Sequence, residues 1–361
     1  MRPALPPVKR VVLKAGSKIL TEELDRRAAE IASDIAAARA RGVQVVFVTS
    51  GAIAMGVRRL GLPGRPAELA ELQACAAVGQ GALMQTYDHA FGAHGITVGQ
   101  VLITHDDFAA RGRFLSARRT LEALLAHGVV PIINENDTVA VEEIKFGDND
   151  LISALVSNLV GADLLVALTD VEGLLDPAGQ LVSFVREASE AAHAGGASSG
   201  VGSGGMASKA QAARAAGRFG VPTVVTSGRV PGALADLLAG VPRGTLFCAD
   251  PKKKLDSRKH WIAYALRPAG TLVVDEGAAR ALQTQGKSLL PSGIVRVEGE
   301  FDVGDPVAIT DLAGRELARG LCAYGAGDVR KLAGKRTGEI EAVLGFRAGD
   351  EIVHRDDLVL L

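Results

Sequence analysis

Two lysines stand beside glycines in patterns that suit phosphate binding. Lys14 ends an apolar run and is followed by Gly16 and Ser17, and a glycine at such a turn lets backbone N–H groups approach an anion. Lys209 lies in the first turn of a predicted helix, behind the glycine-rich residues 202–205, where a helix N-terminus suits the terminal phosphates of a nucleotide. For Lys14, an ordinary turn at the end of a strand is the alternative interpretation.

Polar residues that follow other apolar runs form a second candidate group. Residues 134–137 follow one run, and Asp148, Asn149 and Asp150 lead into a predicted helix. Such clusters are costly as packing but can hold an amino acid's ammonium group or a divalent cation. Ser50 precedes another predicted helix, whose N-terminus favours an anion. An ordinary N-cap remains the alternative for Thr49 or Ser50 and for Asp150.

The sequence lacks the motifs that other reaction types require. Residues 200–205 match a dinucleotide-binding fingerprint formally, but they do not follow the first strand and no acidic residue answers them about 20 positions later. The only Gly-Lys-Ser, at 286–288, has Ala281 where a P-loop needs glycine. No His-Glu-x-x-His motif and no nucleophilic His or Cys motif is present. The lysines and the acidic cluster therefore favour phosphoryl transfer without a P-loop.

The elements that must position these residues form an α/β pattern. Six short apolar runs predict parallel strands that are covered on both faces, and longer segments of helical period separate them. We expect helices over 22–40, behind Thr21 as N-cap, and over 151–160, behind Asp150. The predicted strands are 11–14, 45–49, 96–103, 129–133, 164–169 and 221–226.

Net charge, cysteine spacing and hydrophobicity exclude several classes of protein. The chain has 361 residues and a formal net charge of -1, so no basic excess indicates a nucleic acid or membrane partner. Cys75, Cys248 and Cys322 form no Cys-x-x-Cys pair, which excludes a zinc ribbon and a disulfide framework. No signal peptide or membrane-spanning stretch is recognisable, and a cytoplasmic protein is expected.

A change in the pattern of apolar and polar residues along the chain predicts two domains. Residues 1–250 carry the α/β pattern, 251–270 read as a polar linker, and 271–361 show short apolar pieces between turns, which predicts a small, mostly β domain. Residues 191–205, rich in Gly, Ala and Ser, are predicted to form a mobile loop.

Motifs along nearly the whole chain resemble those of the amino acid kinase family. They are most similar to members that phosphorylate the side-chain carboxylate of glutamate for proline biosynthesis. The motifs are Leu-Lys-Ala-Gly-Ser at 13–17, Val-Thr-Ser-Gly-Ala-Ile-Ala at 48–54, Ala-Val-Gly-Gln at 77–80, Ile-Asn-Glu-Asn-Asp at 133–137, Gly-Asp-Asn-Asp at 147–150, Leu-Thr-Asp at 168–170, Gly-Gly-Met at 204–206, Ser-Leu-Leu-Pro at 288–291 and His-Arg-Asp-Asp at 354–357.

The resemblance implies a layered α/β/α sandwich and a role for each matching residue. Lys14 and Lys209 would flank the transferred phosphoryl group, and Asp148 and Asp150 would organise the substrate amine, the lysines or the metal. Ser50, Asp137 and Asn149 would hold L-glutamate. The residues that would contact ATP are Lys14, Gly16, Ser17, Thr169, Asp170, Ser203, Gly204, Gly205, Met206, Ala207, Ser208 and Lys209.

Further partners follow from the same resemblance. It implies Mg²⁺ carried with the nucleotide, feedback inhibition by proline, and a homodimer or homotetramer. The chain departs from the family at 173–177, so the wall of the pocket beside the nucleotide base is expected to differ. Another amino acid kinase, acting on N-acetylglutamate, aspartate or carbamate, is the first alternative.

The C-terminal part resembles a PUA domain, a module that binds RNA elsewhere. Acidic and basic side chains balance over 257–361, which lacks the basic excess of an RNA-binding surface. We favour a domain that supports assembly or regulation, and an RNA-binding accessory protein is the second alternative.

Overall fold

The computed structural model describes residues 2–20, 23–109, 111–140, 148–186, 205–249 and 267–361. The chain divides into two compact units, Met1–Lys254 and Leu255–Leu361. The linker predicted at 251–270 lies largely outside the described residues, and so does nearly all of the loop predicted at 191–205.

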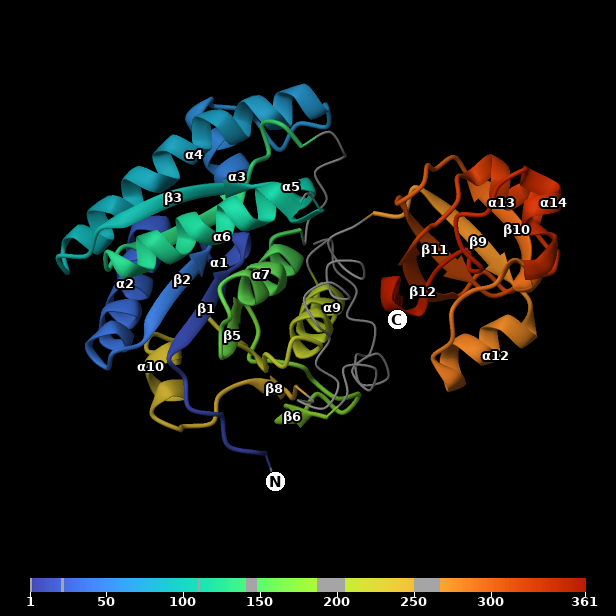
Figure 1. The fold of residues 1–361 in the computed structure, drawn as a ribbon. Coiled ribbons are helices and arrows are strands. Elements are labelled where there is room, and N and C mark those ends of the chain that lie inside the picture. The colour runs from blue at the N-terminus through green and yellow to red at the C-terminus, as the bar shows by residue number, and fades with distance from the viewer. Residues whose placement is uncertain (1, 21–22, 110, 141–147, 187–204, 250–266) are drawn as a thin grey trace. The chain divides into compact units, whose positions relative to one another are not determined.

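The first unit alternates strands and helices (Figure 1). Its elements are β1 (Arg10–Ala15), α1 (Ser17–Leu20), α2 (Leu24–Ala40), β2 (Gln44–Val48), α3 (Ala52–Arg59), α4 (Leu69–Gly92), β3 (Val98–Ile103), α5 (His105–Ala109), α6 (Arg111–Ala126), β4 (Val130–Glu135), α7 (Asp148–Leu159), β5 (Leu164–Thr169), β6 (Phe184–Val185), α9 (Met206–Gly217), β7 (Thr223–Ser227), α10 (Ala233–Leu238) and β8 (Thr245–Phe247).

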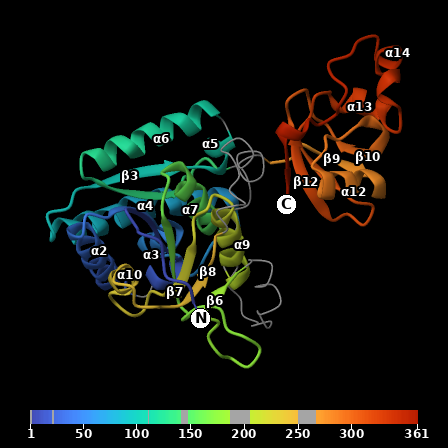
Figure 2. The same ribbon diagram turned by 60° about the horizontal axis from the view of Figure 1, so that its bottom comes forward.

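The strands form one mostly parallel sheet in the order β3-β4-β2-β1-β5-β7-β8-β6. Among the described strands of this sheet, only the pairing of β7 with β8 is antiparallel. The six predicted strands are present, whereas β6 and β8, at one edge of the sheet, were not predicted (Figure 2). The layered α/β/α class expected from the sequence is confirmed.

The centre of the sheet is apolar, as the continuous hydrophobic runs require. Val11, Val12 and Leu13 of β1 are fully buried, and burial of each such side chain contributes about 1.5–3 kcal/mol. The prediction that every strand is covered on both faces is wrong for β3. This strand lies at the edge of the sheet, and Gln100 and Leu102, which point to the same face of it, are exposed because the described helices leave that face uncovered there.

Alternation along β1 decides which layer each side chain enters. Val11, Leu13 and Ala15 join the core cluster that includes α2, α4 and α10. Successive side chains of a strand point to opposite faces, so Lys14 points to the other face of the sheet. Helices α7 and α9 pack against each other on that face.

Two helix starts differ from the prediction. Helix α2 begins at Leu24 with Glu23 at the N-cap position, and Thr21 lies outside the described residues. Helix α7 begins at Asp148, so Asp150 lies within its first turn instead of capping it. The N-cap interpretation of Asp150 is therefore wrong, which leaves its carboxylate available for tertiary contacts.

The second unit is small and mostly β, as predicted. Its strands form one sheet in the order β10-β9-β11-β12-β13 around a core of its own, to which Leu272, Ile309 and Val329 belong. Its elements are β9 (Gly270–Val274), α12 (Glu276–Gln285), β10 (Ile294–Gly299), β11 (Pro306–Thr310), β12 (Glu316–Leu321), α13 (Ala326–Leu332), α14 (Ile340–Leu344) and β13 (Leu358–Leu360).

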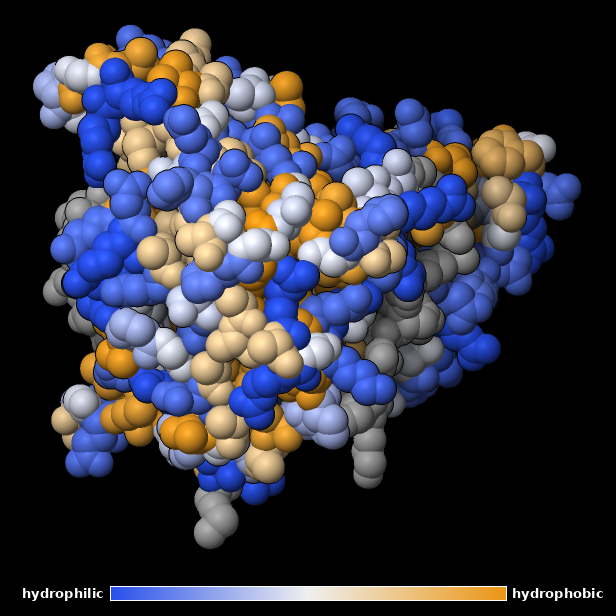
Figure 3. Space-filling view, turned by 90° about the vertical axis from the view of Figure 1, so that its left-hand side faces the viewer, coloured by the Kyte–Doolittle hydropathy of each residue, from blue (hydrophilic) through white to orange (hydrophobic). Residues whose placement is uncertain are grey.

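The visible surface is mixed in character. On the face shown in Figure 3, hydrophobic side chains are interspersed with hydrophilic ones. Within the described ranges, the structure contains no helix with the length and hydrophobicity needed to cross a bilayer.

Candidate active site

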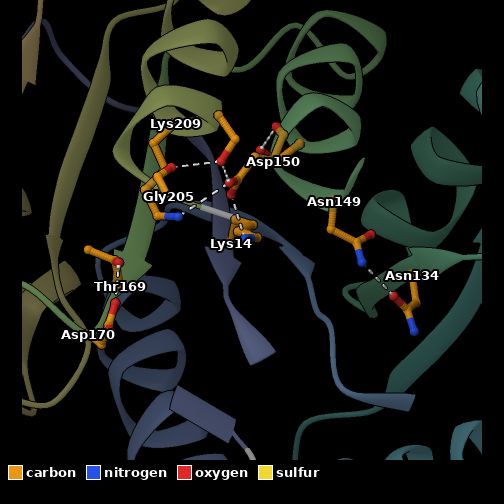
Figure 4. Close-up of polar contacts among 10 residues, drawn as sticks. Lys14, Asn134, Asn149, Asp150, Thr169, Asp170, Gly205 and Lys209 are labelled. Carbon is orange, nitrogen blue, oxygen red and sulfur yellow. Dashed lines mark hydrogen bonds and ion pairs between the residues drawn. The ribbon is translucent and has the colours of Figure 1, made fainter. Parts of the chain in front are cut away.

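Two lysines from distant parts of the chain meet at one carboxylate. Lys14 Nζ donates to Asp150 Oδ1 at 2.5 Å, and Lys209 Nζ donates to Asp150 Oδ2 at 3.3 Å. Figure 4 shows all three side chains pointing toward one another from β1, α7 and α9. The convergence of Lys14 and Lys209 that the sequence suggested is thus present.

The sheet topology explains why these residues meet. In the sheet, β1 and β5 are neighbours, but the chain continues from β1 to β2 on one side and from β5, through β6 at the edge of the sheet, to β7 on the other. Ligands of open α/β sheets bind at the carboxyl edge where such connections diverge. Lys14 stands near the end of β1, and Asp150 and Lys209 stand in the first turns of the helices that lead from that edge.

The cluster is buried and strongly charged. Lys14, Asp150 and Lys209 are 4%, 2% and 7% exposed. Burial alone would raise the pKa of the Asp150 carboxyl, but the two ammonium groups and hydrogen bonds from Lys14 and Ser208 hold it below its usual range. Burial lowers the pKa of Lys14, Asp150 opposes this, and Lys209 adds to it. Asp150 therefore holds both cations in place as a carboxylate.

Ser208 completes the contacts to the carboxylate. Its hydroxyl lies 2.7 Å from Asp150 Oδ2 and 2.8 Å from the carbonyl oxygen of Gly205, in the turn where α9 begins. Met206 is partly buried and Ala207 is exposed in the same turn. The start of α9 is thereby tied to the start of α7.

A chain of three side-chain amides lies beside this cluster. Asn149 Nδ2 donates to Asn134 Oδ1 at 3.2 Å, and Asn134 Nδ2 donates to Gln80 Oε1 at 2.8 Å. Figure 4 shows Asn149 directed toward Asn134 and away from the lysines that Asp150 contacts. Asn149 Oδ1 and Gln80 Nε2 are buried and have no hydrogen-bond partner among the described residues. Leaving buried amide atoms unpaired costs folding free energy. The chain of amides therefore indicates a place for a polar ligand.

The loop after β2 lies next to the amide chain. The backbone N–H of Thr49 donates to the carbonyl of Ile133, which places Ser50 near the end of β4. Helix α3 is capped by Gly51, whose φ of 102° favours glycine, without a side-chain hydrogen bond. The N-cap interpretation of Thr49 or Ser50 is therefore wrong.

The Thr49 hydroxyl instead pairs with Tyr87 Oη at 2.6 Å, inside the core. Burial raises the pKa of the Tyr87 phenol above its usual range, and the hydrogen bond with Thr49 opposes the shift. This pair fixes the backbone just before Ser50.

Asp137 follows β4 and is 8% exposed. Its charge acts on the nearby Arg65 guanidinium. Burial lowers the pKa of Arg65, and the negative charge of Asp137 opposes this shift. Gln73 of α4 donates to the backbone carbonyl of Ala140 at 3.0 Å and so ties the segment after Asp137 to that helix.

Thr169 and Asp170 lie at the end of β5, on the other side of Lys14 from the amide chain (Figure 4). Thr169 Oγ1 donates to Asp170 Oδ1 at 3.1 Å. The backbone N–H of Gly16 donates to Leu168 at 3.4 Å, and a Cβ atom on Gly16 would lie 3.6 Å from Lys14 Nζ. Glycine there leaves room beside the amine, and partly buried Ser17 begins α1.

Some expected contacts fall outside what is described. Ser203 and Gly204 are not among the described residues, and the side chain of Asp148 is not described although its backbone begins α7.

At 173–177, the Asp176 carboxylate accepts hydrogen bonds from the backbone N–H groups of Ala178 and Gln180 at 2.9 and 2.8 Å, which closes a tight turn.

Sequence reasoning assigned no role to Gln80, Tyr87 or Arg65. Gln80 belongs to a quoted motif, but a glutamine in a long helix is typical of a solvent-facing position. Tyr87 and Arg65 carry no local signal at all. Only long-range contacts reveal them.

The arrangement suits transfer of an anionic group. A lysine ammonium group has three N–H donors, so Lys14 keeps donors for an incoming oxygen beyond the one that Asp150 accepts. In the described part of the chain, no three His, Cys, Asp or Glu side chains gather where they could hold a metal ion.

Both units of the chain match known domain families. Residues 9–227 match the amino acid kinase family, and residues 270–344 match the PUA domain. The chain is 51% identical over 369 residues to glutamate 5-kinase of Geobacter sulfurreducens, covering 99% of both chains. It is 50% identical over 372 residues to glutamate 5-kinase of Myxococcus xanthus, covering 100% of this chain and 98% of the relative.

A solved structure shares the fold. Carbamate kinase from Giardia lamblia bound to AMP-PNP superposes with a TM-score of 0.50 at 20% identity, over 67% of this chain and 99% of that chain.

Proposed function

The chain belongs to the amino acid kinase family, and on that premise we propose that it transfers the terminal phosphoryl group of ATP to the side-chain carboxylate of L-glutamate. The convergence of Lys14 and Lys209 on Asp150 carries this proposal, because it supplies two cations for a migrating phosphoryl group. Full-length relatives that are glutamate 5-kinases support the choice of acceptor.

In the proposed reaction, a γ-carboxylate oxygen of glutamate attacks the terminal phosphorus of ATP. A new oxygen–phosphorus bond forms, the bond to the oxygen shared with the β-phosphate breaks, and ADP leaves with the bonding electrons. The product is γ-glutamyl phosphate, the first intermediate of proline biosynthesis. Glutamate's side chain, with a pKa of about 4.3, is ionised at neutral pH, so the reaction requires no general base.

Lys14 and Lys209 donate to the phosphoryl oxygens, whose charge is redistributed in the transition state. Asp150 holds the two ammonium groups at one place through its two oxygens. Placing charged groups in advance matters because no reorganisation is then needed during the reaction.

The remaining residues divide between the two substrates. Ser50 after β2, Asp137 after β4 and Asn149 of α7 hold glutamate. The unpaired Asn149 Oδ1 supports this because it can accept from an ammonium group. The nucleotide contacts the ends of β1 and β5, with Thr169 and Asp170, and residues 203–209, of which Met206 to Lys209 belong to α9.

Magnesium enters the proposal with the nucleotide. When bound, the ion would neutralise charge on the phosphates. The described side chains gather no group of three that could hold the ion by themselves.

The function is tested by measuring ADP release from purified protein with ATP and glutamate, N-acetylglutamate, aspartate or carbamate as acceptor. Trapping with hydroxylamine identifies an acyl phosphate, because it converts the product to a stable hydroxamate. Glutamate-dependent ADP release with hydroxamate formation is expected. ADP release with another acceptor alone would refute the assignment of glutamate.

Two further properties belong to this proposal through the family resemblance. Proline should inhibit the glutamate-dependent reaction, which adding proline to the same assay tests. The protein should form a homodimer or homotetramer, which light scattering tests by molar mass.

A further inference from the structure

The amide chain of Gln80, Asn134 and Asn149 has a direction. Each link uses an N–H donor of one residue and the oxygen of the next, so donation runs from Asn149 through Asn134 to Gln80. The Oδ1 acceptor of Asn149 is left at one end, and the Nε2 donor of Gln80 is left at the other.

The central link is held within the protein. Asn134 is 1% exposed and Gln80 is 9% exposed, and they come from β4 and α4, 54 positions apart in the sequence. Gln80 is fixed by close packing of its helix: a Cβ atom on neighbouring Gly79 would lie 1.8 Å from the carbonyl oxygen of Ala52 in α3. Glycine at 79 therefore allows the two helix backbones to touch, and this contact places Gln80.

A side-chain amide can present either its oxygen or its nitrogen to a neighbour. When Gln80 Oε1 faces Asn134, the Asn134 amide must turn its nitrogen to Gln80 and its oxygen to Asn149. Asn149 must then donate to Asn134, and its own oxygen stays available. A reversed chain would present N–H donors at Asn149, which cannot bind an ammonium group.

We propose that Gln80 is a positioning residue: its Oε1 atom sets the direction of the amide chain, so that Asn149 presents an acceptor to the ammonium group of the amino acid substrate. The inference rests on the proposed function, since it names what selects an α-amino acid over a plain dicarboxylate. Gln80 acts through Asn134 and Asn149.

Two substitutions at Gln80 separate the oxygen's role from general packing. Gln80→Met keeps the length of the side chain but removes the acceptor, so the direction of the chain is lost. We expect the KM for glutamate to rise about tenfold, because a hydrogen bond to a charged group is at stake, while the KM for ATP stays the same. Gln80→Glu keeps an acceptor oxygen and should retain a KM close to that of the wild type.

The acceptor glutarate, which lacks the ammonium group, gives a readout that a merely structural role would not move. Wild-type protein should prefer glutamate over glutarate in kcat/KM, and Gln80→Met should reduce this preference about tenfold by weakening glutamate alone. In the Gln80→Met/Asn149→Ala double variant, the KM for glutamate should equal that of Asn149→Ala, because residues that act through one another are not additive.

Gln44→Met is the matched control. Gln44 Oε1 also accepts hydrogen bonds, from Arg10 at 3.0 and 2.7 Å, but it lies at the start of β2, away from the carboxyl edge. This variant should keep the wild-type preference for glutamate, and thermal melting shows that each variant is folded.

The outcomes distinguish the two proposals. Wild-type protein that releases no ADP with glutamate refutes the proposed function, and the inference falls with it. If the wild type is active, a Gln80→Met variant with unchanged glutamate KM overturns the inference alone. Equal losses for glutamate and glutarate, or a Gln80→Glu variant as impaired as Gln80→Met, also overturn it.

Discussion

Replacing Asp150 by asparagine tests the central cluster most directly. Asp150→Asn keeps the shape of the side chain but removes the negative charge that both lysines contact, at 2.5 and 3.3 Å. Its new amide nitrogen would face Lys209 or Ser208 with donors where the native oxygen accepts. Two buried ammonium groups would then lack the carboxylate that holds them.

The size of the effect follows from burial. Removing one partner of a buried ion pair costs about 3–5 kcal/mol of folding free energy. For a domain of this size, each kcal/mol lowers the melting temperature by about 2–4 °C, so a loss of roughly 6–20 °C is expected. Misplacing both cations should lower kcat by about 10²- to 10³-fold, as loss of one charge-stabilising donor does in other enzymes.

The pH dependence has a definite sign. In the wild type, the pKa of Asp150 lies below its usual range, so its contribution to stability is present above the unfolded pKa and is lost as pH falls through the folded pKa. Asp150→Asn should lack that acid-side loss. Burial already lowers the pKa of Lys14, and without Asp150 nothing in the cluster opposes it. The variant's stability should therefore increase as pH rises toward the unfolded pKa of lysine.

The assays are thermal melting across pH and steady-state kinetics of ADP release with glutamate. Asp163→Asn is the matched control, because its carboxylate accepts from the backbone N–H groups of Lys9 and Arg10 at the opposite edge of the sheet. This control should lose about 1 kcal/mol of folding free energy but keep the wild-type kcat. An Asp150→Asn enzyme with wild-type kcat and melting temperature would refute the role of the carboxylate.

Other predictions concern single functions. Lys14→Ala and Lys209→Ala should each lower kcat by about 10²-fold or more while the KM for glutamate changes little; a rise in KM alone would contradict their placement at the phosphoryl group. Asn149→Ala should chiefly raise the KM for glutamate, by about tenfold or more, and unchanged KM would show that it does not bind the acceptor. Because charge is balanced over 257–361, a gel-shift titration should detect no RNA binding even at low salt, and a salt-sensitive shift would restore that alternative.

Six strands of the first sheet could be predicted from the sequence, and the family resemblance implied that the two lysines meet. Lys14 follows a continuous apolar run, and parallel strands bring their carboxyl ends to one edge, so position along the chain translates into position in space. The strands β6 and β8 were missed because two or three residues carry no detectable period. The exposure of β3 was missed because an apolar run does not reveal which strand lies at the edge.

The candidate site was predicted less completely than the fold. Asp150 was expected in the site, but whether it contacts the substrate amine, the lysines or the metal was left open, because its two lysine partners lie 136 and 59 positions away along the chain. Gln80 had no visible role because its partner lies on another element and nothing in the helical pattern indicates it. Contacts that close a site across the fold are set by tertiary packing, which local sequence patterns do not encode.

Helix α7 presents Asn149 to the amide chain and Asp150 to the lysines, as consecutive residues of its first turn. Consecutive side chains on a helix point about 100° apart. Any rotation or sliding of this one segment therefore displaces both Asn149, which is proposed to bind glutamate, and Asp150, which holds the lysines. To change the acid that the enzyme accepts, an engineer should therefore keep the position of the first turn of α7 and substitute residues on the elements that face it.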